Sequence, residues 1–344
     1  MIVRLLPAIL LALLAFTASA ADDIVLKEQH PQRYVVKKGD TLWDIAARFL
    51  RDPWRWPDIW YVNPQIENPH LIYPGDQVEL TYKDGKPQLT LRRGGGRRTV
   101  KLSPQVRREP LQRGIPTIPM DAIRQFLGRP GVVTDRQLEQ SPYIVSSEDK
   151  HLVMGKGDHI YVSGIVPGGA TRYRIIRPGE TYADPDSGEV LGHESIYVGE
   201  AVVERFGDPA VLRLTHSDRE ALTADRLLPA ESEPMLDNFV PHAPEGDLQG
   251  RIIDVVDGVS RIGQYQTVVL NKGERDGLEE GHVLGVYRAG DTIRDPVERD
   301  REVTLPDVEA GYVFVFRTFD RVSYALVMKA VRDMRIHDMV RNPT

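Results

Sequence analysis

The chain has 344 residues, of which 41% are hydrophobic and 27% are charged, and its formal net charge is -6. This length suffices for two or three domains, and the composition is typical of a folded globular protein. The sequence contains no cysteine, which excludes disulfides, thiol catalysis and cysteine-ligated metals.

Residues 1–20 are expected to be a secretory signal peptide. Arg4 supplies a positive charge, residues 5–16 form a short apolar run, and residues 18–20 read Ala-Ser-Ala, a small-residue cleavage site. The run is too short to span a bilayer, although an uncleaved N-terminal anchor is the alternative. With cleavage near Ala20, we expect a periplasmic protein with no transmembrane segment in the mature chain.

Residues 30–81 show the pattern of a small βααβ unit that holds all four tryptophans of the chain. A β-branched strand is expected at 34–36, and Thr41 stands three residues before Asp44, close to a capping box. Apolar residues at helical spacing follow from Leu42 to Phe49. Pro57 suits the first turn of a second helix, residues 63–64 end that helix, and residues 77–80 form the closing strand.

This stretch resembles a LysM module, a βααβ fold that binds N-acetylglucosamine polymers, which in bacteria means peptidoglycan. The resemblance implies that the glycan lies between two loops, with these residues as contacts: Gly39, Asp40, Thr41, Leu42, Asn63, Pro64, Ile72, Tyr73, Pro74 and Gly75. Several of them also have a purely structural interpretation, because Asp40 and Thr41 could only cap a helix. Trp54 and Trp56, in an insertion between the helices, could stack on sugar rings or, as we favour, pack against the second helix.

Residues 83–118 carry ten Lys or Arg and two acidic residues, with Arg-Arg-Gly-Gly-Gly-Arg-Arg at 92–98. Glycine-rich, self-repelling segments are flexible, so we expect a basic linker here. It could contact anionic lipid or a phosphate-bearing polymer, but a solvated spacer is the favoured interpretation. Nucleic acid is not expected as a partner in the periplasm.

The rest of the chain predicts two β-rich domains, at 119–230 with a short N-terminal helix and at 247–343. Short β runs alternate with Gly, Pro and Asp, which is typical of small barrels or sandwiches. An internal repeat is expected, pairing 157–162 with 281–286, 173–179 with 286–290, 183–185 with 294–296, 196–203 with 312–319, and 225–229 with 338–343. Residues 273–281 form a Gly- and Asp-rich string that favours turn chemistry.

The string at 273–281 resembles a turn of envelope-associated β domains, including the C-terminal region of the FlgT flagellar protein. The order of signal peptide, LysM module, basic linker and paired β domains resembles the type IV pilus secretin-associated protein family (TsaP). That resemblance implies a periplasmic adaptor, with peptidoglycan bound by the LysM module and an outer-membrane secretin bound by the C-terminal part. The fold class expected is therefore α+β multidomain, a βααβ module followed by two mainly-β domains.

Other functions remain open at this level. The nine histidines show no zinc-peptidase pattern and no Gly-x-Ser-x-Gly elbow occurs, so we expect no enzyme, cofactor or metal. Paired carboxylates for glycan cleavage are not excluded, because their separation is spatial. A regulator of a peptidoglycan synthase or hydrolase is the main alternative, and a lytic enzyme a lesser one.

Overall fold

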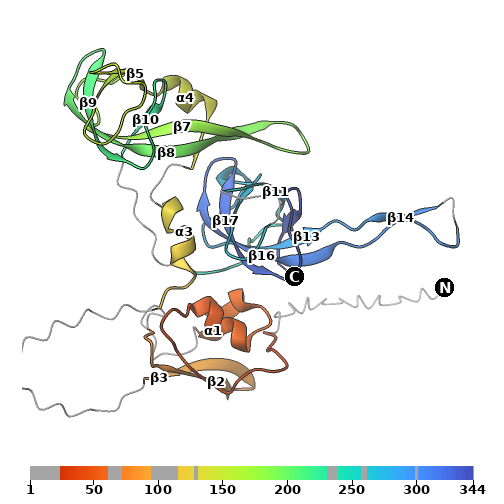
Figure 1. The fold of residues 1–344 in the computed structure, drawn as a ribbon. Coiled ribbons are helices and arrows are strands. Elements are labelled where there is room, and N and C mark those ends of the chain that lie inside the picture. Colours follow the sequence, from red (N-terminus) through yellow and green to blue (C-terminus); the bar gives the residue numbers. More distant parts are fainter. Residues whose placement is uncertain are drawn as a thin grey trace, which may run out of the picture.

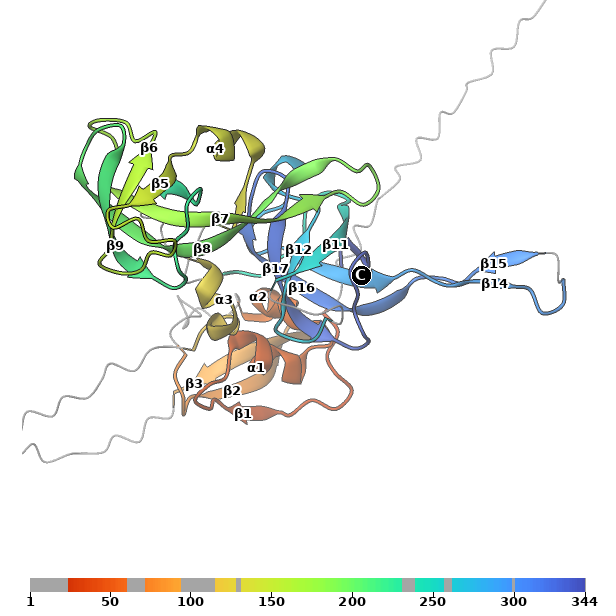
Figure 2. The same ribbon diagram turned by 45° about the horizontal axis from the view of Figure 1, so that its top comes forward.

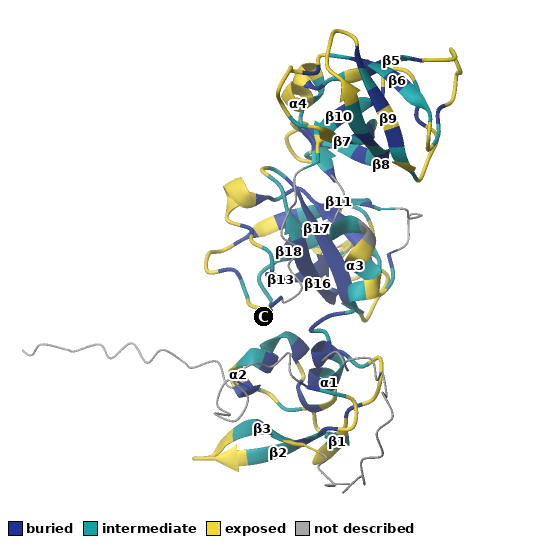
Figure 3. Cartoon of the chain, turned by 90° about the vertical axis from the view of Figure 1, so that its left-hand side faces the viewer, coloured by how far each residue is buried: buried dark blue, intermediate teal, exposed yellow. Residues whose placement is uncertain are grey.

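The computed structural model describes residues 24–60, 72–93, 115–127, 131–230, 239–256, 262–298 and 301–343. Three units lie in a row: a small α/β unit at one end, one β unit at the other, and a second β unit between them (Figures 1 and 3). The expected fold class, a small module with helices followed by mainly-β domains, is confirmed. The expected signal peptide, residues 1–20, lies outside the described residues.

The α/β unit packs two helices on a three-stranded antiparallel sheet of order β1-β2-β3. Its elements are β1 (Arg33–Val35), α1 (Leu42–Phe49), the 3₁₀ turn η1 (Pro53–Arg55), α2 (Trp56–Trp60), β2 (Gln77–Lys83) and β3 (Lys86–Arg92). Ile45, Phe49 and Ile59 of the helices are fully buried against Val78 of β2 and Leu89 of β3. The apolar spacing of the first helix therefore gives the core that it predicts.

Strand β3 corrects the expected linker at 83–118. Residues 86–92 pair with β2 along their whole length, from Lys83 opposite Lys86 to Gln77 opposite Arg92. Asp84 and Gly85 connect the strands with φ of 51° and 79°, the left-handed pair of a tight hairpin turn. Leu89 is fully buried, so this part of the basic segment belongs to the core of the unit. Residues 94–114 lie outside the described residues.

The β unit at the far end contains a ring of six strands. Its elements are β4 (Val132–Val133), α4 (Asp135–Gln140), β5 (Tyr143–Ser147), β6 (His159–Ser163), β7 (Arg172–Ala183), β8 (Val190–Arg205), β9 (Ala210–Ser217) and β10 (Arg226–Pro229). Because β9 pairs with both β6 and β8, the strands from β5 to β10 close on themselves, with β4 added at the side of β8. Ile160, Leu212 and Leu227 are fully buried inside the ring.

The central β unit is a closed barrel of order β11-β12-β17-β16-β13-β18. Its elements are β11 (Gln249–Val255), β12 (Thr267–Leu270), the 3₁₀ turn η3 (Glu274–Asp276), β13 (Val283–Arg288), β14 (Thr292–Arg294), β15 (Glu302–Thr304), β16 (Val308–Thr318), β17 (Ser323–Ala330) and β18 (Met339–Arg341). The hairpin of β14 and β15 projects from the barrel as an arm (Figure 2).

Both rings have the same connectivity. Numbered along the chain, the six strands of each ring lie in the order first, second, fifth, fourth, third, sixth. By this order, 196–203 in β8 corresponds to β16 and 225–229 in β10 to β18, as the sequence repeat has it. The segment 157–162 lies in the second strand of its ring, however, so its counterpart is β12 and not the 281–286 segment that leads into β13.

A shared apolar interface joins the three units. It comprises Trp43 from α1, Ile118, Ile123 from α3 (Met120–Leu127), Tyr182 and Leu191 from the β7–β8 hairpin, Phe239, and the outer face of the central barrel with Phe314, Phe316, Tyr324 and Leu326. The helix α3 packs on this barrel, although the β7–β8 domain follows it in the chain. Phe126 lies 6.1 Å from both Phe316 and Tyr324 between ring centroids, and Arg317 Nη1 donates to its carbonyl at 2.6 Å.

Candidate functional site

The first loop of the expected glycan site is a tight turn whose polar groups are paired within the unit. Gly39 has a φ of 95°, which favours glycine, and the Asp40 N–H donates to Lys37 O at 3.2 Å. The Asp40 carboxylate accepts from Lys37 N at 2.8 Å and from Tyr34 Oη at 2.9 Å. Burial, followed by this carboxylate, raises the pKa of Tyr34. Asp40 therefore holds the loop shape.

Thr41 and Leu42 begin the helix α1. Thr41 and Asp44 form the capping box that their spacing indicates, with Asp44 N donating to Thr41 Oγ1 at 3.0 Å. Both Thr41 and Leu42 are buried, with 4% and 2% of their surface exposed. Their side chains thus serve the fold, so a ligand of this loop would have to use backbone groups.

The second loop has the same design as the first. Gly75 has a φ of 99°, the Asp76 carboxylate accepts from Tyr73 N at 3.0 Å, and Gly75 N donates at 2.8 Å to the carbonyl of Val36, the residue that follows β1. Ile72 is fully buried, Tyr73 is half-buried, and Pro74 and Gly75 are exposed. Asn63 and Pro64, the other expected contacts, lie outside the described residues.

The structure brings both loops to one short stretch of chain, residues 115–118. Ile115 N donates to Ile72 O at 2.8 Å on one side. On the other side, Leu42 N donates to Pro116 O at 3.0 Å and Trp43 N to Thr117 O at 3.1 Å. Sequence reasoning missed this contact, because it assigned the stretch to the end of a linker. No local signal marks a backbone pairing across more than forty residues.

The tryptophans pack within the protein. Trp56 is 2% exposed and lies edge-on to Trp60, with ring centroids 6.4 Å apart, so it packs with the second helix as favoured. Trp54 lies partly buried against the shared interface. The α/β unit is also tied to the central barrel by polar contacts, from Tyr312 Oη to Asp52 Oδ1 at 3.3 Å and from Tyr265 Oη to Asp44 Oδ1 at 3.5 Å. Burial raises the pKa of both tyrosines.

Comparison with known families gives this unit an identity, since the LysM domain model matches residues 34–81. Residues 34–81 are a LysM domain. A LysM domain supports binding to peptidoglycan. The chain is also 42% identical over 60 residues to the uncharacterized protein YqbP of Bacillus subtilis (strain 168). That alignment covers 14% of this chain and 27% of the relative, so the chain spans about a quarter of the length of YqbP.

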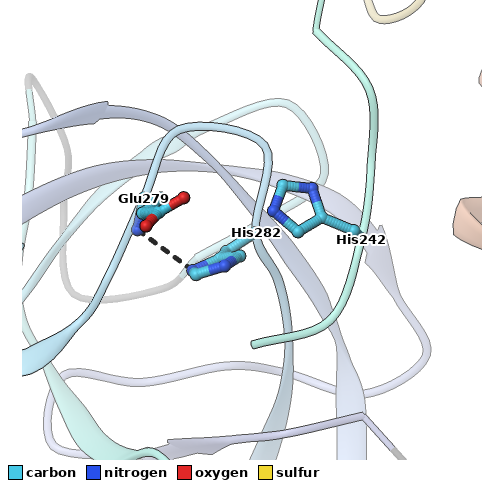
Figure 4. Close-up of side chains that lie close together, drawn as sticks. All are labelled: His242, Glu279 and His282. Atoms are coloured by element: carbon cyan, nitrogen blue, oxygen red, sulfur yellow. Dashed lines mark hydrogen bonds between the residues drawn. The ribbon is translucent and has the colours of Figure 1, made fainter. Parts of the chain in front are cut away.

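Outside the LysM domain, three side chains with metal-ligand chemistry gather at one side of the central barrel. Ligand atoms of His242, Glu279 and His282 lie within 4.8 Å of one another (Figure 4). His282 Nδ1 accepts from Glu279 N at 3.0 Å, so the neutral ring carries its proton on Nε2 and offers no free lone pair. His242 Nδ1 donates to Val240 O at 2.9 Å. In this tautomer His282 cannot ligate a metal ion, so the cluster does not supply three protein ligands at once.

The histidine cluster instead attaches an incoming segment to the barrel. His242 N donates to Gly281 O at 3.1 Å, and Val283 N donates to His242 O at 2.8 Å, which forms a parallel bridge between the two histidines. Phe239 in the same segment lies edge-on to Phe314, with centroids 5.6 Å apart. Burial, and then the neighbouring His242, lowers the pKa of His282.

Among the described helices, none combines the length and apolar character needed to cross a bilayer.

Proposed function

We propose that this protein is a periplasmic, non-catalytic adaptor that binds peptidoglycan through its LysM domain and anchors an outer-membrane secretin complex of type IV pili through its C-terminal β domains. The observation that carries the first half is the LysM match at 34–81, together with the two loops that face one stretch of chain. The second half rests on the order of domains in the sequence and on the resemblance to the secretin-associated family.

The arrangement of the loops supports recognition through backbone groups. An N-acetyl sugar needs donors and acceptors for its amide and an apolar wall for its methyl group. The first turn of α1 carries N–H donors and Ile72 carries a carbonyl, which residues 115–117 bond in this structure, and Tyr73, Pro74 and Gly75 form the second loop's partly or fully exposed part. We propose Tyr73 as the side chain of this loop that contacts glycan. Its ring is half-buried and stands next to the exposed Pro74 and Gly75.

The glycan site is tested with Tyr73→Ala in the full chain and purified sacculi. We expect the affinity for sacculi, measured by co-sedimentation, to fall by about tenfold. The stacking of one aromatic ring on a sugar contributes roughly 1–2 kcal/mol. Tyr82→Ala is the matched control, because Tyr82 lies on β2 of the same α/β unit, is 62% exposed, and its variant should bind like the unaltered chain. Equal loss in both variants, or loss in neither, would contradict the assignment of Tyr73.

The partner is tested separately by capturing proteins on the full chain from a detergent-solubilised envelope. Recovery of a secretin, in similar amounts with Tyr73→Ala, supports an adaptor whose β domains bind the partner. Recovery of a peptidoglycan synthase or hydrolase without a secretin supports the regulator. Release of soluble muropeptides from sacculi by the purified chain would replace both with a lytic enzyme.

A further inference from the structure

Residues 115–117 bond to both LysM loops through the chain's own backbone. A helix leaves its first N–H groups without acceptors inside the helix. In α1 these groups are all satisfied, with Leu42 N bound to Pro116 O, Trp43 N bound to Thr117 O, and Asp44 N bound to Thr41 Oγ1. The carbonyl of the second loop, Ile72 O, is taken by Ile115 N.

Side chains hold this stretch in place on both sides. Ile115 is 4% exposed and belongs to the core of the LysM domain. Ile118 is fully buried and belongs to the shared interface, together with Trp43 of α1. Thr117 is 1% exposed, and its hydroxyl has no hydrogen-bond partner within the described part of the chain. Because burial of a hydroxyl without a hydrogen-bond partner costs free energy, this contact is less stable than one made by apolar side chains alone.

We infer that residues 115–118 are an internal occupant of the glycan groove, and that peptidoglycan engages the LysM domain only when this stretch is displaced. The inference rests on the proposed function, because it takes the two loops as the glycan site. Occupant and glycan use the same backbone donors and the same carbonyl. They therefore compete. The apparent affinity for glycan equals the affinity of the open groove multiplied by the fraction of molecules in which the groove is open.

Displacement of the stretch reaches beyond the LysM domain. Pro119 is the last residue before α3, and α3 is fixed to the central barrel through Phe126 and the 2.6 Å bond from Arg317. Trp43 and Ile118 pack in the same interface as the tip of the β7–β8 hairpin. Opening of the groove thus disturbs the contact through which all three units meet. Wall binding and the arrangement of the β domains are then linked, and each biases the other.

The test compares Ile118→Ala with the unaltered full chain in binding of chitotetraose, the N-acetylglucosamine tetramer, by calorimetry. Removal of a buried isoleucine weakens the closed state, so we expect binding about tenfold tighter or more. Ile160→Ala is the matched control, an equally buried isoleucine in the core of the first ring, and its affinity should stay within about twofold of the unaltered chain. Equal or weaker binding by Ile118→Ala overturns the inference.

Amide hydrogen exchange of the unaltered chain provides a second measurement that does not depend on a variant folding. We expect saturating chitotetraose to speed exchange at Ile115, because its bond to Ile72 O is lost, while amides in β11 and β12 stay protected. Unchanged or slower exchange at Ile115 in the bound state overturns the inference and leaves the adaptor standing. If neither chain binds chitotetraose or sacculi, the proposed function fails, and the inference fails with it.

Discussion

Two of the three glycines in the string at 273–281, Gly273 and Gly277, are required for different physical reasons, and alanine substitutions separate them. Gly273 has an extended backbone with φ of -140°, but a Cβ there would lie 2.2 Å from Phe319 O and 2.6 Å from Asp320 O. The same backbone accepts from Glu274 N at 2.9 Å and Arg275 N at 3.1 Å. Gly277 has a φ of 81° and open space within 4 Å of its Cβ position.

We expect Gly273→Ala to cost about 3–4 kcal/mol in unfolding free energy, from overpacking against rigid backbone and loss of up to two hydrogen bonds. Gly277→Ala should cost about 1 kcal/mol, because only the left-handed conformation is strained. Urea unfolding followed by circular dichroism of the β structure measures both. Equal costs for the two variants, or a larger cost at Gly277, would refute the reasoning that backbone contact with residues 319–320 fixes this turn.

Two further predictions concern stability. Because the pKa of His282 is lowered below 6.5, the folded state binds fewer protons than the unfolded state, so stability is present above pH 6.5 and is lost as pH falls below it. The charged and titratable groups that face His282 are His242, Glu279 and Glu245. The variant His282→Asn keeps an acceptor for Glu279 N, and we expect its urea midpoint to depend less on pH between pH 5 and 7.5. An unchanged pH dependence would show that other groups govern the loss of stability. Gly85→Ala should destabilise the LysM domain by about 1 kcal/mol, because alanine is strained in the left-handed conformation of Gly85. Urea unfolding followed by tryptophan emission measures this cost. No effect would mean that the LysM domain does not need β3.

The LysM core could be predicted from sequence because its signals are local. Thr41 and Asp44 cap α1 within three residues, and the apolar spacing from Leu42 to Phe49 is that of one helix face.

Strand β3 was not predicted from the sequence, because positive charge dominates residues 83–98 and indicated a linker. The local signals of a hairpin are nevertheless present. Asp84-Gly85 is a strong hairpin signal, and Leu89 and Leu91 supply alternating apolar residues. Net charge describes the surface of a segment and does not exclude pairing.

The candidate site could be predicted only as far as local geometry reaches. The turns at Gly39 and Gly75 follow from their sequence, since both need a left-handed glycine and a carboxylate one residue later. Thr41 caps the helix, as the structural interpretation expected, whereas Asp40 instead holds the preceding turn through Lys37 N and Tyr34 Oη. The occupant of the groove could not be predicted, because it depends on three backbone bonds across long sequence separations, which leave no pattern in residue type.

The strands of the central barrel show how the units depend on one another. In β16, Val313 and Val315 point into the barrel core while Phe314 and Phe316 belong to the shared interface. A strand of a free barrel would alternate apolar and polar residues, whereas a strand covered on both faces reads as a continuous apolar run. The run in β16 is therefore explained only if the barrel's outer face is covered by neighbouring units, as it is here by α1, α3 and the β7–β8 hairpin.

This coverage changes how wall attachment would work. For a LysM domain on a free tether, the gain from avidity is largest when the tether length matches the distance between binding sites, and it falls as the tether lengthens. Here Trp43 and Trp54 lie against the central barrel, and Asp44 and Asp52 accept bonds from its tyrosines, so the domain has a fixed position relative to the β units. Pulling force on a wall-bound LysM domain would then pass through the shared interface before it reaches any tether.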